Sequence, residues 1–217
     1  MPSLSLRLWA PVIVVAVLVA CAPVQNVTPS ARAPQPVAAE DEHAHHEHME
    51  GMPPVTIPAG ALFVEADVRF MQGMIAHHAQ AVYMTGLAEG AGASPRVLRL
   101  AQKIDLSQAG EIQLMQGWLR ANGQFTPDTS SWRTMRMAGM LTDAELQQLA
   151  QSRGTDFDRL FLQLMIRHHE GAISMVADLL SSPRAAQDVD VNVLANEVEV
   201  SQLAEIELMW QMLDELN

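Results

Sequence analysis

Phe70-Met-Gln-Gly-Met-Ile-Ala-His-His-Ala-Gln-Ala-Val-Tyr-Met84 returns later in the chain as Phe161-Leu-Gln-Leu-Met-Ile-Arg-His-His-Glu-Gly-Ala-Ile-Ser-Met175. Phe, Gln, Met-Ile, His-His, Ala and Met recur at the same relative places in both stretches. Apolar residues in each stretch follow the three-four spacing of a buried helical face. The repeat therefore predicts two related helices, each of which carries a His pair and Met side chains into the interior of one fold.

The residues that follow each stretch are also repeated. Leu100-Ala-Gln-Lys-Ile104 matches Leu194-Ala-Asn-Glu-Val198, and Ser107–Met115 matches Ser201–Met209. A lone helical hairpin cannot bury its own apolar stripe, whereas two hairpins can pack together. The sequence therefore predicts an all-α four-helix bundle, built from two repeated helical hairpins, that occupies residues 61–217. The predicted helices span 61–89, about 95–121, 155–180 and about 193–216, with a short helix at 142–152 in the long connection.

Start signals support these helix limits. Ser94-Pro95 is typical of an N-cap followed by a first-turn proline. Residues 142–145 form a capping box, and residues 155–158 resemble a second helix start. The apolar periodicity places Leu106 and Leu203 on the inward faces of the second and fourth long helices.

Composition limits the possible functions. The chain has 217 residues and a net charge of −12, and no basic stripe is present to neutralise nucleic-acid phosphates. We therefore expect no nucleic-acid partner. All 8 His fall in three clusters, at 43–48, 77–78 and 168–169, and Met is abundant at 14. This clustering indicates metal binding more than a scattered surface distribution would.

Residues 1–21 resemble a bacterial lipoprotein signal peptide. Arg7 precedes a short apolar run that ends in Leu18-Val-Ala-Cys21, and Cys21 is the only cysteine. We expect Cys21 to be lipidated, which would anchor the protein to the cell envelope on its periplasmic side. The alternative is ordinary signal cleavage with an incidental cysteine. A single cysteine also excludes an intramolecular disulfide and a multi-thiolate metal site.

Residues 22–60 are rich in Pro, Ala and polar residues, which predicts a disordered tether. The tether contains a His- and Met-rich tract that is typical of soft-metal binding, although it could also be a solvated polar linker. The candidate ligands of this tract are His43, His45, His46, His48, Met49 and Met52.

The repeated helices carry the main candidate metal site. Imidazole and thioether together suit Cu(I), with Cu(II) bound through the imidazoles, whereas Ca²⁺ and Mg²⁺ require clustered oxygen ligands. Two adjacent His on a buried stripe are costly unless they are paired or ligated. The candidate ligands are Met74, His77, His78 and Met84 on one helix and Met165, His168, His169 and Met175 on the other.

Matched acidic and sulfur residues leave alternatives open. A ferritin-type di-iron site would use Glu and Glu-x-x-His motifs, but no Glu-x-x-His occurs on the repeated helices, where Met stands three residues before the first His of each pair. The carboxylates could instead hydrogen-bond the imidazoles or cap a helix, and the His pairs could be a hydrogen-bonded polar core without metal. The supporting or alternative ligands are Asp67, Glu111, Met115, Asp158, Glu205 and Met209.

The doubled motif Met-Ile-x-His-His-x-x-Ala-[Val/Ile]-x-Met, each copy followed by Gln-x-x-Glu-Ile-x-x-Met, resembles the domain of unknown function 305 family. The segment Met137-Ala-Gly-Met140-Leu-Thr, followed by Glu145, also resembles the region between that family's repeats. The resemblance covers about 61–216. It implies a ferritin-like, exported four-helix bundle with a link to copper binding, and a metal role for both His pairs and their neighbouring Met. It implies no established enzymatic activity.

The resulting hypothesis is a lipid-anchored periplasmic protein that binds copper, favouring Cu(I), to sequester it or hand it on. One alternative is a ferritin-like metal-dependent redox enzyme with carboxylate ligands. The other is a structural lipoprotein whose His pairs are polar core residues.

Overall fold

The computed structural model describes residues 52–216, and this part of the chain is helical without any β-strand. The predicted all-α class is therefore confirmed. Four long helices are joined by turns and by one longer connection that contains two short helices. In chain order the elements are α1 (Glu65–Gly86), α2 (Pro95–Ala121), the 3₁₀ helix η2 (Thr129–Arg133), α3 (Asp143–Gln151), α4 (Gly154–Ser181) and α5 (Val189–Glu215).

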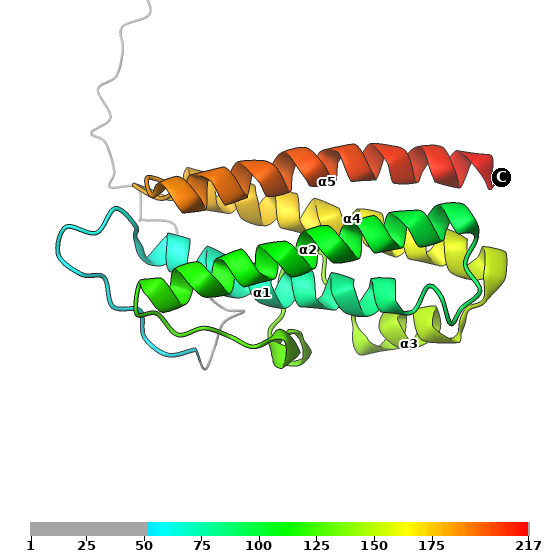
Figure 1. Ribbon diagram of the computed structural model, residues 1–217, viewed down its shortest axis with the longest axis horizontal. Helices are drawn as coiled ribbons and strands as arrows, with labels where there is room; N and C mark the ends of the chain where they lie inside the picture. The colour runs from blue at the N-terminus through cyan, green and yellow to red at the C-terminus, as the bar shows by residue number, and fades with distance from the viewer. Residues whose placement is uncertain (1–51, 217) are drawn as a thin grey trace, which may run out of the picture. The chain divides into compact units, whose positions relative to one another are not determined.

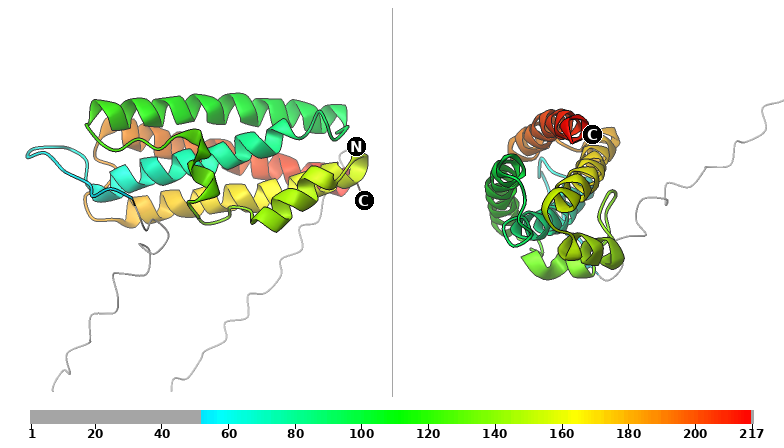
Figure 2. Two further views of the ribbon diagram at one scale, coloured as in Figure 1. Left: turned by 90° about the horizontal axis from the view of Figure 1, so that it is seen from below. Right: turned by 90° about the vertical axis from the view of Figure 1, so that its right-hand side faces the viewer.

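The long helices lie alongside one another (Figure 1). α1 packs mainly against α2, α4 packs mainly against α5, and α1 also contacts α4. In the end-on view of Figure 2 the four long helices surround a common interior, with η2 against α1 and α3 beside α4. The Gly154 N–H at the start of α4 donates to the carbonyl of Ala91, just beyond the end of α1 (2.9 Å). α1 and α4 therefore run in opposite directions, which brings their midpoints to the same level.

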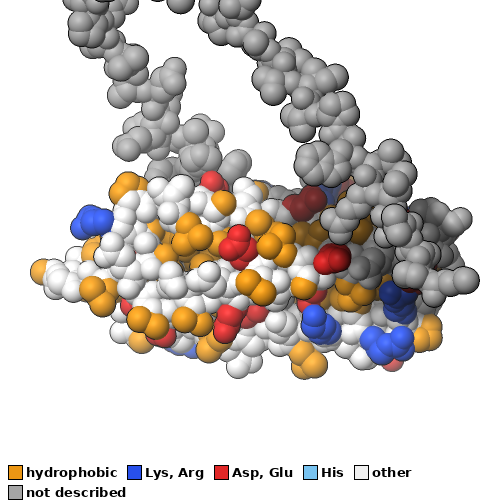
Figure 3. Space-filling model, turned by 90° about the horizontal axis from the view of Figure 1, so that it is seen from above, with side chains coloured by type: hydrophobic (Ala, Val, Ile, Leu, Met, Phe, Trp, Pro, Cys, Tyr) orange, Lys and Arg blue, Asp and Glu red, His pale blue; other side chains and the backbone are white. Residues whose placement is uncertain are grey.

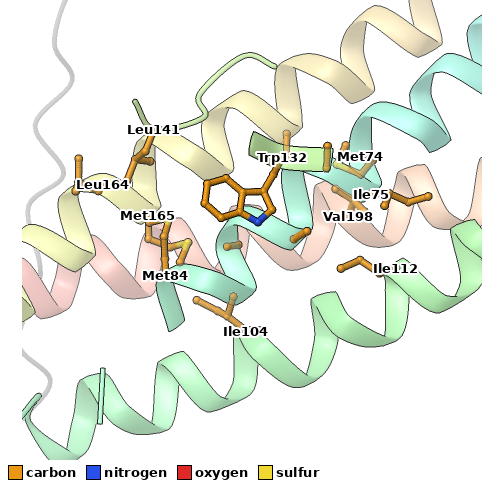
Figure 4. Close-up of a cluster of buried hydrophobic side chains, with 14 of the residues drawn as sticks. Met74, Ile75, Met84, Ile104, Ile112, Trp132, Leu141, Leu164, Met165 and Val198 are labelled. Atoms are coloured by element: carbon orange, nitrogen blue, oxygen red, sulfur yellow. The ribbon is translucent and has the colours of Figure 1, made fainter. Parts of the chain in front are cut away.

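The interior is packed with unbranched thioethers as well as aliphatic side chains. Figure 4 shows Met74 and Met84 of α1, Met165 of α4 and Ile104 and Ile112 of α2 directed into the same interior. Methionine adapts its shape to irregular space, which suits a core with few aromatic rings. Met71 is buried at 1% exposure, and the Met side chains with no exposed surface are Met74, Met84, Met115, Met165 and Met209.

Two of the three predicted helix starts are confirmed. Ser94 Oγ accepts a hydrogen bond from the Val97 N–H (3.4 Å), and residues 142–145 form the predicted capping box at the start of α3. The capping box predicted at 155–158 is not formed, because α4 begins one residue earlier, at Gly154, without a side-chain cap. The Asp158 carboxylate is used elsewhere, since both of its oxygens accept from the Ser94 N–H (3.1 and 3.2 Å).

Asp67 and Asp158 hold the turns of opposite hairpins. Asp67 Oδ2 caps its own helix by accepting from the Val64 N–H, and its Oδ1 accepts from the Ala186 N–H between α4 and α5 (2.7 Å each). Ala186 has a φ of 54°, in the left-handed region that non-glycine residues rarely adopt. A charge-assisted hydrogen bond stabilises that turn. Asp158 of the second hairpin in return holds the turn between α1 and α2.

Leu106 and Leu203 do not face inward as predicted, since they are 76% and 50% exposed. Gln108 and Gln202 are buried at the same turns instead, at 3% and 2% exposure. The face that α5 presents in Figure 3 accordingly shows hydrophobic side chains among Asp and Glu. Its exposed apolar residues are Val189, Val193, Val200, Leu203 and Trp210.

α1 begins and ends slightly inside the limits predicted for it. α5 starts four residues earlier than predicted, with Asp188 as its N-cap. Residues 52–60 form no helix, but Met52 and Val55 pack against the core and the Thr56 carbonyl accepts from Gln124 Nε2 (2.8 Å). The predicted signal peptide with Cys21, and the tether up to Gly51, lie outside the described residues. No helix in the described part is long and apolar enough to cross a membrane.

Candidate metal centre

The two His pairs meet in the middle of the interior. All four imidazoles are fully buried, at 0% exposure. The ring centroids of His77 and His168 lie 3.8 Å apart, at a tilt of 39°. His78 lies 6.3 Å from His77, and His169 lies 6.5 Å from His168, between ring centroids. The antiparallel arrangement of α1 and α4 thus gathers the four rings into one layer, which we call the imidazole layer.

Oxygen atoms hold one nitrogen of three of these rings. His78 Nε2 lies 2.6 Å from Glu111 Oε2, and His169 Nε2 lies 2.8 Å from Glu205 Oε2. His77 Nε2 lies 3.1 Å from the carbonyl oxygen of Ala138. Carboxylates and carbonyls only accept hydrogen bonds, so Nε2 carries the proton and donates it in each case. In the neutral form of a ring bound in this way, Nδ1 carries a free lone pair.

Five imidazole nitrogens in this layer have no hydrogen-bond partner. They are Nδ1 of His77, His78, His168 and His169, together with Nε2 of His168. A buried polar atom without a partner costs roughly 1–3 kcal/mol. Four of these atoms, one on each neutral ring, can offer a lone pair, because one nitrogen of His168 carries the ring proton. A metal ion bound to these lone pairs would reduce that cost, and it would complete the carboxylate–imidazole–metal arrangement seen at metal sites. The donor set therefore fits a metal that prefers nitrogen and sulfur.

Burial favours the neutral form of His77, His168 and His169, which is the form that binds metal. Burial, reinforced by the neighbouring His78 and His169, lowers the pKa of His77 well below its ordinary value. Burial and the ring of His77 do the same to the pKa of His168. Burial also lowers the pKa of His169, although the hydrogen bond to Glu205 opposes it. Metal binding requires a deprotonated imidazole nitrogen, so the lowered pKa values favour it.

The two carboxylates are engaged on both of their oxygens. Glu111 Oε1 accepts from Ser107 Oγ (3.1 Å), and Glu205 Oε1 lies 3.3 Å from Lys103 Nζ. Burial raises the pKa of Glu205, but the hydrogen bonds from His169 and Lys103 outweigh it, and the pKa is lowered overall. Glu111 also lines an open pocket of about 500 Å³ between α2 and α5. The carboxylates therefore orient the imidazoles, and Glu111 connects the layer to solvent.

The Met candidates are divided between the interior and the surface. Met74 and Met165 stand three residues before the first His of each pair and four before the second, so each is a neighbour of both rings on its helix. Both are fully buried, as are Met84, Met115 and Met209, while Met175 is half-buried. No group of three or more His, Cys, Asp or Glu within residues 52–216 is placed to hold a metal by itself. A metal at the imidazole layer would therefore draw on Met sulfur as well.

The remaining candidates lie elsewhere. Asp67 and Asp158 do not contact the imidazoles, because they hold the turns between helices. Met52 packs half-buried against the core. His43, His45, His46, His48 and Met49 lie outside the described residues.

Sequence reasoning missed two buried amides beside the site. Both side-chain polar atoms of Gln108 and of Gln202 are buried without a partner. They stand three residues before Glu111 and Glu205, on the same helices. The signal was present in the sequence, since Ser-Gln recurs at 107–108 and 201–202 within the second repeated element. The repeated Ser-Gln was overlooked because the nearby leucines fit the apolar periodicity better.

The Ala138 carbonyl was also missed, and no local sequence signal marks it. Gln80 binds both the N–H (2.7 Å) and the carbonyl (3.0 Å) of Leu141, which fixes the end of this segment on α1. On α4, a Cβ atom at Gly171 would lie 2.1 Å from Ala138 O, so only glycine permits this approach. The segment 137–141 is thereby held between α1 and α4, with one carbonyl directed at His77.

Comparison with known proteins gives consistent matches. The sequence profile of the family described as "Domain of unknown function (DUF305)" matches residues 67–213. No curated protein matches the chain at a significant level. A DUF305 protein from Streptomyces coelicolor, presumed to be secreted, is 32% identical with a TM-score of 0.62, over 70% of this chain and 93% of its own. A DUF305 fragment from Deinococcus radiodurans is 31% identical with a TM-score of 0.61, over 70% of this chain and 98% of its own.

The protein CopM is a further structural relative. Its Cu(I)-bound form is 27% identical with a TM-score of 0.56, over 69% of this chain and 96% of its own. Its Cu(II)-bound form is 26% identical with a TM-score of 0.58, over 70% of this chain and 97% of its own.

Proposed function

This chain belongs to the DUF305 family, and on that basis we propose that it binds copper outside the cytoplasm, to sequester the ion or hand it on. The observation that carries the proposal is the imidazole layer. Four buried rings offer five nitrogens without a hydrogen-bond partner, and oxygens hold the opposite nitrogen of three rings. Cu(I) is the favoured ion, because imidazole nitrogen and Met sulfur are its preferred ligands.

The relatives support a metal-handling role. CopM has structures with Cu(I), with Cu(II) and with Ag bound. The Streptomyces coelicolor relative is presumed to be secreted, which supports a location outside the cytoplasm. In our proposal the ligands are His77, His78, His168 and His169, with sulfur from Met74, Met84, Met165 and Met175.

The proposal also includes the architecture that the repeat predicts. The four long helices would form a ferritin-like bundle of two hairpins, and both hairpins would contribute equally to the site. Cys21 would anchor the chain to the periplasmic side of the envelope after removal of residues 1–20. Residues 43–52 of the tether would capture ions before they reach the bundle. The anchor and the capture tract lie outside the described helices, and all of these elements rest on the sequence pattern.

The carboxylate geometry favours a carrier over a redox enzyme. In a ferritin-like oxidase, Glu111 and Glu205 would be metal ligands. Here each carboxylate binds an imidazole Nε2 and a second donor, so both orient ligands instead of presenting oxygen to a metal. Glu111→Gln and Glu205→Gln should then weaken Cu(I) binding about 10–100-fold without abolishing it. Complete loss of binding would favour the oxidase.

Cu(I) titration against a competing chelator tests the main proposal. The variant with all four bundle His replaced by Gln should lose the tight site, while far-UV circular dichroism reports that it remains helical. A matched variant with His43, His45, His46 and His48 replaced by Asn should keep the tight site, because it alters only the tether. Unchanged affinity in the helical bundle variant would refute the assignment of the imidazole layer.

A further inference from the structure

Two half-buried methionines meet beside α1, outside the imidazole layer, and a third half-buried methionine folds onto the same segment. Met137 and Met140 belong to the connection before α3, and Met175 lies on α4. A Cβ atom at Gly73 would lie 3.1 Å from Met137 Sδ and 3.3 Å from Met175 Cε. The Met137 N–H donates to Met140 Sδ (3.3 Å), which folds the third thioether back onto the same short segment. The three side chains are drawn from two parts of the chain far apart in sequence.

Gly73 provides the room for this convergence. Any larger side chain there would meet the two thioethers of Met137 and Met175. The matching position in the second copy of the repeat is Leu164, which is buried at 9% exposure. The first copy therefore lacks a side chain at the position that the sulfur-bearing segment approaches, and the second copy has no such space. This asymmetry gives the two hairpins different surroundings on either side of the imidazole layer.

Met137, Met140 and Met175 pack against the core, but their partial exposure distinguishes them from the Met side chains inside it. Met74, Met84, Met115, Met165 and Met209 have no exposed surface, as expected of side chains used for packing. Met137, Met140 and Met175 are each half-buried, so solvent reaches part of each side chain. Neutral thioethers select soft monovalent ions and disfavour hard divalent ones.

We infer that Met137, Met140 and Met175 form a second site for a soft monovalent cation, Cu(I) or Ag(I), at the surface, which assigns Met175 to this site instead of the imidazole layer. The site adjoins the imidazole layer: Gly73 stands one helical turn before His77, and the carbonyl of Ala138, next to Met137, accepts from His77 Nε2. An ion held by the three sulfurs is thus one turn from the buried nitrogens. Such a site would be an entry point for ions that go on to the imidazole layer. That role rests on the proposed function, whereas the site itself does not.

Methyl-¹³C-methionine NMR of the full-length chain with Ag(I) tests the inference. The methyl signals of Met137, Met140 and Met175 should shift together, and Zn²⁺ should not shift them. Met135 is the matched control, because it lies in the same connection but is buried at 7% exposure, and its signal should stay in place. Met137→Leu should suppress the Ag(I) response of the other two signals.

Two results would overturn the site. One is three unmoved signals at several equivalents of Ag(I), and the other is an unchanged response of Met140 and Met175 in the Met137→Leu variant. Repeating the titration after replacing the four bundle His by Gln separates this inference from the proposed function. The three methyl signals should still shift in that variant, and their silence there would show that no independent sulfur site exists. Unshifted His ring signals in the Cu(I)-treated wild-type chain would refute the imidazole-layer site alone.

Discussion

Acidification should destabilise the metal-free protein well above the pH at which carboxylates titrate. The imidazoles of His77, His168 and His169 are buried, and burial, with the neighbouring rings, lowers the pKa of each. In the unfolded chain these rings regain an ordinary pKa near 6.5. Below that pH the unfolded state binds protons that the folded state does not, so stability falls as pH falls.

The magnitude follows from the number of rings. Moving from pH 7.5 to 5.5 costs about 1.4 kcal/mol for each imidazole that stays neutral in the folded state. His77 and His168, whose pKa is lowered well below the ordinary value, therefore contribute about 3 kcal/mol, and His169 adds a smaller amount of the same sign. A domain of this size is typically stable by about 5–15 kcal/mol, so the loss is a large fraction of the total. The imidazole contribution is complete above pH 6.5 and declines from there toward the pKa of each folded ring.

Carboxylates do not obscure this window. The hydrogen bond from Arg167 lowers the pKa of Glu145 to about 2. Its contribution is present above the ordinary Glu pKa of about 4.3 and is lost only as pH falls toward 2. The lowered pKa of Glu205 has the same sign and the same upper limit. A decline between pH 7.5 and 5.5 therefore reports the imidazoles.

Urea denaturation of the chelator-treated chain at pH 7.5, 6.5 and 5.5 measures the effect. The free energy of unfolding should fall at each step, with the larger drop below pH 6.5. An unfolding free energy that is constant or rises toward pH 5.5 would refute the view that these rings are neutral in the folded protein.

Three variants test other parts of the structure. Gly171→Ala places a Cβ 2.1 Å from the Ala138 carbonyl oxygen, so it should displace segment 137–141 and lower the unfolding free energy by about 1–3 kcal/mol in thermal melts; an unchanged melting temperature would contradict that close approach. Gln108→Leu with Gln202→Leu removes four unpartnered polar atoms, so the metal-free double variant should be as stable as the wild type in urea, or more stable; a clear loss would show that the amides are satisfied by bound water. Asp67→Asn should speed amide hydrogen exchange in the turn between α4 and α5 about tenfold, because a charge-assisted hydrogen bond there is worth roughly 1.5 kcal/mol more than a neutral hydrogen bond. Equal exchange rates in the variant and the wild type would argue against that contact.

Much of the fold follows from local patterns in the sequence. The helical class and the starts of α2 and α3 depend on spacing and caps that lie within a few residues of each other. The hydrogen bonds from His78 to Glu111 and from His169 to Glu205 join matched positions of the two hairpins, so one alternative weighed from the sequence is what the structure contains.

The errors come from partners that are distant in sequence. Asp158 resembles a local cap, but its carboxylate binds the Ser94 N–H of the other hairpin. Leu106 fits the apolar periodicity, yet the helix turns Gln108 inward at that level, because a helical stripe is wide enough to accept either. Backbone groups such as the Ala138 carbonyl carry no residue-specific signal, so their place in the site becomes visible only in three dimensions.

Asp67 and Asp158 each hydrogen-bond to the turn of the other hairpin, and this affects the order of folding. Each hairpin is local, whereas the Asp67 bond to Ala186 spans 119 positions and the Asp158 bond to Ser94 spans 64. Closing long loops is slow, so the hairpins should mature first and dock last. The imidazoles of α1 and α4 face each other only after that docking. A newly made chain therefore has no assembled metal site before the hairpins dock. An ion that binds after docking should slow the separation of the two hairpins.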